Sequence, residues 1–119
     1  MSLIKDTIQS EGKLCPIKFA VNIIGGKWKM YIIWILEKRG TLRYNELKRQ
    51  IVGITDMMLT QCLKQLESDD IVERIQYNEI PPRVEYCLTQ EGKSLFLALF
   101  EIANWSKNRM EKMGIEWDE

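Results

Sequence analysis

The chain has 119 residues, 45% of them hydrophobic, and its 17 lysines and arginines balance 17 aspartates and glutamates. This length allows one domain with one modest core, to which a partner subunit can add. Histidine is absent from the sequence, which removes the usual general base, the commonest transition-metal ligand and every histidine-activated nucleophile. We therefore expect a protein that is not an enzyme and that uses no cofactor.

The apolar residues come in short periodic groups, and no run of about 18 of them exists to span a bilayer. The start of the chain also lacks the basic region and continuous apolar run of a secretory signal. Its three cysteines are an odd number and lie far apart, which suits neither a disulfide framework nor a structural zinc site. We expect a cytoplasmic protein with reduced thiols, no metal site and no membrane partner.

Two helices are predicted before residue 40. Pro16 suits the first turn of a helix because its missing N–H has no intrahelical partner there, and Cys15 then occupies the cap position. This helix runs to about Ile24 and ends at two glycines. A second helix is expected at about 27–38, where apolar residues recur at helical spacing.

Two further helices follow a short extended piece at 41–43. Residues 44–50 predict a two-turn helix, and the brief connection 52–54 contains a glycine. Thr55 can then cap a fourth helix that runs to about Asp69, because its hydroxyl can accept a bond from a free N–H of the first turn. Two helices joined by so short a turn are typical of a helix-turn-helix.

The rest of the chain predicts a hairpin and one long helix. The β-rich segments 71–77 and 83–88 form the hairpin, or wing, and its tip at 78–82 contains two prolines that cannot donate to a strand ladder. Thr89 can cap a last helix at about 90–112. Its apolar stripe is wider than one small domain needs, which favours a second subunit covering part of it.

Together these elements predict an α+β fold, mostly α: a winged helix-turn-helix with a two-stranded wing and a long C-terminal helix. We treat residues 1–119 as one domain. The winged-helix core is expected at about 14–88, and helices within about 1–24 and 89–113 are expected to contribute to dimerisation.

The fourth helix has one inward stripe, formed by Leu59, Cys62, Leu63 and Leu66. The same periodicity puts a polar, nearly uncharged side outward, which suits hydrogen bonding to base edges. Phosphate contacts are expected from the basic stretch 27–50, which holds seven lysines and arginines against two glutamates, and from the wing. The predicted DNA-binding residues are Arg43, Thr55, Met57, Thr60, Gln61, Lys64 and Arg83. Each of them alone is equally consistent with a solvated surface, and their position in a helix-turn-helix followed by a hairpin favours DNA for the set.

Several motifs, in order, carry a family resemblance: IGGKWKMYIIWIL, LRYNEL, GITDMMLTQCLKQLESDDIVER and IPPRVEYCLTQEGKSL. Over about residues 14–106 the chain resembles the HxlR-type winged-helix regulators. The resemblance implies a bacterial or archaeal dimeric regulator, with the Thr55 helix in the major groove and the wing at 78–82 touching flanking DNA. Met57 stands where that family often has lysine or arginine, so we expect affinity to depend on the Arg43 region and the wing as much as on the fourth helix.

Cys15 is a candidate redox sensor. A helix N-terminus with Lys13 and Lys18 nearby favours the thiolate, and the resemblance implies that some relatives respond to oxidants or electrophiles through a cysteine in this CP context. The alternative is a half-buried cap without a signal. Cys62 is expected in the core, whereas Cys87 is expected on the exposed side of a wing strand and is a second candidate.

The function that this sequence predicts is a sequence-specific transcriptional regulator, binding double-stranded DNA as a homodimer on a pseudo-palindromic operator, with an oxidant or small-molecule effector as a further partner. The alternative is a winged-helix module that contacts proteins and does not bind DNA. Binding to random duplex that weakens steeply with salt would favour the regulator.

Overall fold

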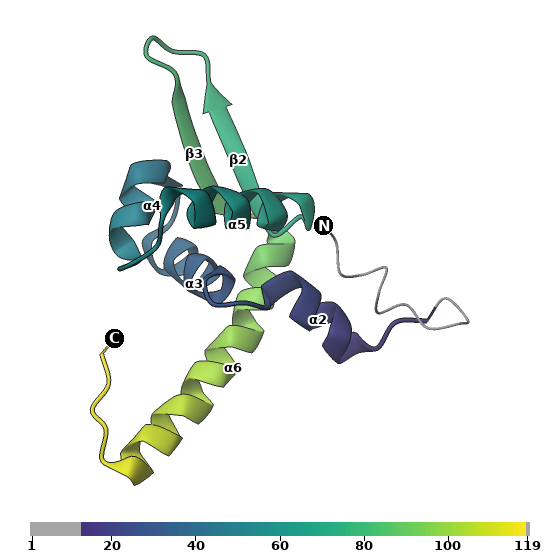
Figure 1. The fold of residues 1–119 in the computed structure, drawn as a ribbon, viewed down its shortest axis with the longest axis vertical. Helices are drawn as coiled ribbons and strands as arrows, with labels where there is room; N and C mark the ends of the chain where they lie inside the picture. The colour runs from purple at the N-terminus through teal and green to yellow at the C-terminus, as the bar shows by residue number, and fades with distance from the viewer. Residues whose placement is uncertain (1–12, 119) are drawn as a thin grey trace.

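The computed structural model describes residues 13–118 (Figure 1). The elements in chain order are α2 (Pro16–Ile24), α3 (Lys29–Arg39), β1 (Leu42–Arg43), α4 (Tyr44–Gln50), α5 (Asp56–Ser68), β2 (Val72–Tyr77), β3 (Arg83–Leu88) and α6 (Gln90–Met113). This order confirms the predicted winged helix-turn-helix with its wing and long last helix. The part of the predicted dimer contribution that falls on residues 1–12 lies outside the described residues.

The turn between α2 and α3 is set by two glycines. Helix α2 begins with Pro16 in its first turn and Cys15 as N-cap, as predicted, and the Gly25 N–H closes it by donating to the Val21 carbonyl. A Cβ on Gly25 would lie 2.3 Å from that carbonyl oxygen. Gly26 has φ +88°, a conformation that a helix cannot continue through. Helix α3 therefore starts two residues later than predicted.

The sheet has three antiparallel strands in the order β1-β3-β2. The hairpin pairs Val72 with Leu88 and Tyr77 with Arg83, which confirms the predicted wing. Leu42 of β1 pairs with Tyr86 of β3, so the extended piece at 41–43 adds a third strand to the predicted two. A two-residue strand has too little periodicity to reveal a partner so distant in the sequence.

The hydrophobic core lies between the helix-turn-helix, α3, the base of the wing and the first half of α6. All four predicted inward residues of α5 are buried. The largest side chains with almost no exposed surface are Ile32, Ile33, Leu47, Leu59, Leu66 and Val72. Burying one such side chain stabilises the fold by about 1.5–3 kcal/mol, so this core fixes how α5 sits on the domain.

Helix α6 is attached closely to the base of the wing. The Thr89 hydroxyl donates to the Asp70 carbonyl at 2.6 Å and accepts from the Gly92 N–H at 3.0 Å. A Cβ on Gly92 would lie 2.2 Å from the Ile71 carbonyl oxygen, so only glycine lets the helix approach this far. The predicted Thr89 cap is confirmed, and it joins α6 to the start of β2.

Two expectations about exposure are wrong. Lys29, counted in the phosphate-facing basic stretch, is only 8% exposed, because the first turn of α3 packs against the domain. Cys87 is half-buried instead of exposed on the wing strand, and burial raises the pKa of its thiol.

Among the described helices, none is by itself long and apolar enough to cross a membrane. Helices α2 and α3 meet that test of length and composition only together, with a bend of 74° between them.

Candidate nucleic-acid interface

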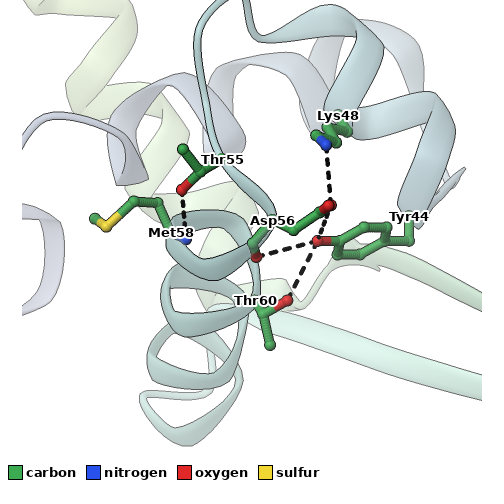
Figure 2. Close-up of polar contacts among 6 residues, drawn as sticks. All are labelled: Tyr44, Lys48, Thr55, Asp56, Met58 and Thr60. Atoms are coloured by element: carbon green, nitrogen blue, oxygen red, sulfur yellow. Dashed lines mark hydrogen bonds and ion pairs between the residues drawn. The ribbon is translucent and has the colours of Figure 1, made fainter.

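Helix α5 is the predicted reading helix, and its first turn is capped by Thr55. The Thr55 hydroxyl accepts a hydrogen bond from the Met58 N–H at 3.1 Å (Figure 2). This confirms the predicted cap, which typically contributes about 1 kcal/mol. The hydroxyl oxygen accepts within the helix, and its own O–H proton is left free to donate.

A polar cluster, which we call the Tyr44–Asp56 clamp, joins α4 to α5. The Tyr44 hydroxyl lies 2.9 Å from Asp56 Oδ1 and 3.2 Å from Thr60 Oγ1, and Lys48 Nζ lies 3.0 Å from the same Asp56 oxygen (Figure 2). The Lys48 ammonium and then the Tyr44 hydroxyl hold the pKa of Asp56 below its usual value. The clamp therefore links the two helices at the surface, beside the point where the Tyr44 ring packs against the core.

Sequence reasoning missed this clamp. The pattern predicted that Thr60 contacts DNA, yet the Thr60 hydroxyl faces Tyr44. The available signal is the four-residue spacing of Tyr44 and Lys48, which puts both on one face of α4. That spacing shows which residues share a face and does not show what they meet.

All four of the predicted DNA-binding residues within α5 are on its surface, Thr60 among them. Met57 is 77% exposed, and Gln61 and Lys64 are also exposed. Gln61 offers an amide that can pair with adenine, Lys64 a cation for guanine or phosphate, and Met57 an apolar tip for a thymine methyl. The outward side of α5 thus combines hydrogen bonding with apolar contact and carries little charge.

Arg43 is placed at the joint between β1 and α4. Its backbone N–H donates to Glu46 Oε1 at 2.8 Å, which fixes the start of α4. Its side chain is exposed, and within residues 13–118 its guanidinium makes no ion pair or hydrogen bond. An exposed guanidinium with all its donors open is suited to a phosphate.

Arg83 is in a different situation at the wing. Its Nη2 lies 3.1 Å from Glu79 Oε1, its Nε lies 4.0 Å from Glu85 Oε2, and its guanidinium carbon lies 4.0 Å from the centre of the Tyr77 ring. A hydrogen bond to Glu85 raises the pKa of Tyr77. The positive charge of Arg83 is therefore already paired with carboxylates inside the wing. A DNA phosphate would have to compete with Glu79 for the guanidinium.

The three cysteines differ in their electrostatics. Backbone N–H groups of Lys18 and Ile17 at the start of α2 lower the pKa of Cys15. Burial raises the pKa of Cys62, which is in the core as predicted. Because burial also raises the pKa of Cys87, Cys15 is the cysteine that the fold shifts toward the thiolate.

The sequence profile of the HxlR-like helix-turn-helix family matches residues 23–113. The chain belongs to this family. A similar relative of this HxlR-like protein is named an HTH-type transcriptional regulator of Methanothermobacter thermautotrophicus. The two are 46% identical over 102 residues, which is 86% of this chain and 77% of the relative.

Two solved structures resemble the HxlR-like protein closely. The redox regulator HypR in its reduced form is 36% identical, with a TM-score of 0.78 over 84% of this chain and 98% of HypR. The reduced form of the transcriptional regulator YodB from B. subtilis is 35% identical, with a TM-score of 0.70 over 79% of this chain and 92% of YodB. The HxlR-like protein is thus a transcriptional regulator and not an enzyme, as its sequence predicts.

Proposed function

We propose that the protein binds a specific operator sequence as a homodimer, with α5 in the major groove and the wing tip at 78–82 against flanking DNA. The observation that carries this proposal is the outward side of α5. Met57, Gln61 and Lys64 are exposed on a helix whose opposite side is buried and whose first turn is fixed by the Tyr44–Asp56 clamp. A rigid helix with an open polar side is what direct readout requires.

Phosphate contacts are assigned mainly to Arg43, whose guanidinium is open, and secondarily to Arg83, which must first leave Glu79. Thr60 is assigned a contact through its methyl group, because its hydroxyl faces Tyr44. Thr55 acts by capping α5. A protein that binds an operator must be in the compartment that contains the chromosome. We therefore assign this protein to the cytoplasm.

Support for the homodimer comes from apolar surface that one chain leaves uncovered. On α6, Leu97 is 65% exposed and Trp105 67%, and on α2, Ile17 is 72% exposed. Figure 1 shows the second half of α6 projecting away from the other helices and the sheet. A long helix with exposed apolar side chains in this position is suited to packing against a second copy.

The experiment that tests this function is selection of bound sequences from a random duplex pool with the full chain. We expect an inverted repeat whose half-sites are centred about 10 base pairs, or a multiple of one helical turn, apart. Sedimentation of the same sample is expected to show a dimer. A failure to bind any duplex at low salt would contradict the proposal and favour a protein-interaction module.

We further assign Cys15 as a redox sensor, with an oxidant or electrophile as effector. Its pKa is lowered at the start of α2, next to the surface assigned to the dimer, and HypR, a similar structure, is described as a redox regulator. Oxidant is expected to weaken operator binding by the wild type and by Cys87→Ser, and to have no effect on Cys15→Ser. Undiminished sensitivity of Cys15→Ser would refute this role.

A further inference from the structure

A groove of about 590 Å³ lies between the turn from α2 to α3 and the side of α5. Val21, Trp28 and Met58 provide apolar lining, and the backbone at Gly25 and Gly26 lines the turn. This volume lies within the range of sites that hold a small molecule, about 300–1,000 Å³. The function proposed above uses Gln61 and Lys64 from the lining of this groove and assigns no role to Trp28, Lys29 or Met58.

The decisive residue in the groove is Lys29. It lines the groove although only 8% of its surface is exposed. In the part of the chain that the structure describes, its ammonium has no carboxylate or hydrogen-bond partner. Most of the Lys29 side chain is therefore packed in the domain, while its ammonium, which is not among the fully buried polar atoms of the described residues, reaches the groove. A cation held at this position by a packed side chain can pair with an anion that enters the groove.

The Cys62 thiol, which lines the same groove, does not compensate this charge. Lys29 acts electrostatically on Cys62, but burial raises the pKa of that thiol, so it is neutral at physiological pH. Lys27 and Lys64 line the same groove, and Asp69 is the one acidic residue that lines it among the described residues. The lining as a whole is therefore positive.

The start of α3 adds to this field. Lys29 is the first residue of this 11-residue helix, and the Trp28 N-cap provides no side-chain cap. The first intrahelical bond is donated by Ile32 to the Trp28 carbonyl, so the N–H groups of the first turn have no acceptor within the helix. Such N–H groups and the helix dipole favour an anion.

We propose that this groove binds a small organic anion, whose carboxylate or phosphate pairs with Lys29 at the start of α3 and whose apolar part packs on Trp28 and Met58. Gln61 and Lys64 of α5 line the same groove. The anion therefore competes with operator DNA for these two residues, a consequence that depends on the function proposed above.

Benzoate is a suitable probe because it joins one carboxylate to one flat apolar ring. We expect calorimetric titration of the full chain, at constant ionic strength and without DNA, to detect benzoate binding, with amide NMR shifts centred on the first turn of α3. Lys29→Met is expected to weaken binding at least tenfold, and Lys29→Arg to retain most of it. Lys93→Met removes the same charge from the exposed face of α6 and serves as the matched control.

The variant Lys29→Met places an apolar side chain of similar length in the same largely buried position, so it is expected to fold. The proposal would be overturned if Lys29→Met and the wild type bound benzoate equally. It would also be overturned if the wild type bound none of benzoate, acetate and inorganic phosphate at millimolar concentration. If duplex DNA displaced benzoate equally from the wild type and from the double variant Gln61→Ala Lys64→Ala, the site would bind DNA phosphate. That result would also overturn the proposal. Because the titration contains no DNA, its failure would leave operator binding unaffected.

Discussion

Acidic residues act in opposite ways in two regions of the molecule, the joint between α4 and α5 on one side and the wing on the other. At the joint, Asp56 is bound by Lys48 and Tyr44, and Arg43 keeps its guanidinium open. In the wing, Glu79 and Glu85 flank the guanidinium of Arg83. Two arginines that look equivalent in the sequence therefore differ in the charge that they can offer to DNA.

The largest effect is expected from removing the open charge. Arg43→Gln should lower the slope of log affinity against log salt by about 0.9 for each phosphate that is no longer neutralised, or about 1.8 for the two copies of a dimer. The measurement is operator binding across a salt series. Lys93→Gln, which removes an exposed charge of α6 outside the basic stretch 27–50, is the matched control, and an equal slope for Arg43→Gln and wild type would remove Arg43 from the interface.

A smaller effect is expected at the wing, because Arg83 is already compensated. Arg83→Gln should flatten the same slope by less than Arg43→Gln does. Glu79→Gln removes the closer carboxylate and should make the slope steeper than in the wild type, since Arg83 is then open to phosphate. If Arg83→Gln and Arg43→Gln had equal effects, the proposed difference between wing and joint would be wrong.

The Tyr44–Asp56 clamp can be weakened by a substitution that leaves its charged residues unchanged. Tyr44→Phe removes the hydroxyl that contacts Asp56 and Thr60 and should lower the free energy of unfolding by about 1 kcal/mol. Urea unfolding measures this change. Tyr31→Phe, on an exposed tyrosine of α3, is expected to leave stability unchanged, and an equal loss in both variants would mean that the clamp contributes nothing.

The smallest effect concerns pH. The pKa of Asp56 is lower in the fold than its usual value of 3.8, so its contribution to stability is present in full above that value and is lost as the pH falls through the lowered pKa. The difference in unfolding free energy between wild type and Asp56→Asn should be constant from about pH 5 to about pH 7 and shrink below about pH 4. A difference that grows on acidification would contradict the assignment of the ion pair.

Local rules were sufficient for the helices, the caps and the hairpin. The Thr55 cap and the inward stripe of α5 depend on spacing within one turn or two, and the structure confirms both. The exposure of Met57, Gln61 and Lys64 follows from the same periodicity. What a sequence pattern predicts best is therefore which side of a helix is outward.

Contacts between distant segments could not be predicted in this way. The pairing of Leu42 with Tyr86, and the clamp from Tyr44 to Asp56, join residues whose separation leaves no periodic trace. The burial of Lys29 is the same kind of miss, because it depends on how the first turn of α3 packs against α5. A count of basic residues also cannot distinguish Arg43 from Arg83.

The contact of Gly92 with Ile71 makes α6 and the base of the wing move as one piece. A helix of 24 residues is about 36 Å long at about 1.5 Å per residue. A displacement of about 3 Å at its far end therefore turns the helix by about 5°, and the wing turns with it. In the proposed homodimer, a change in the angle at which the two α6 helices cross would therefore turn both wings as well.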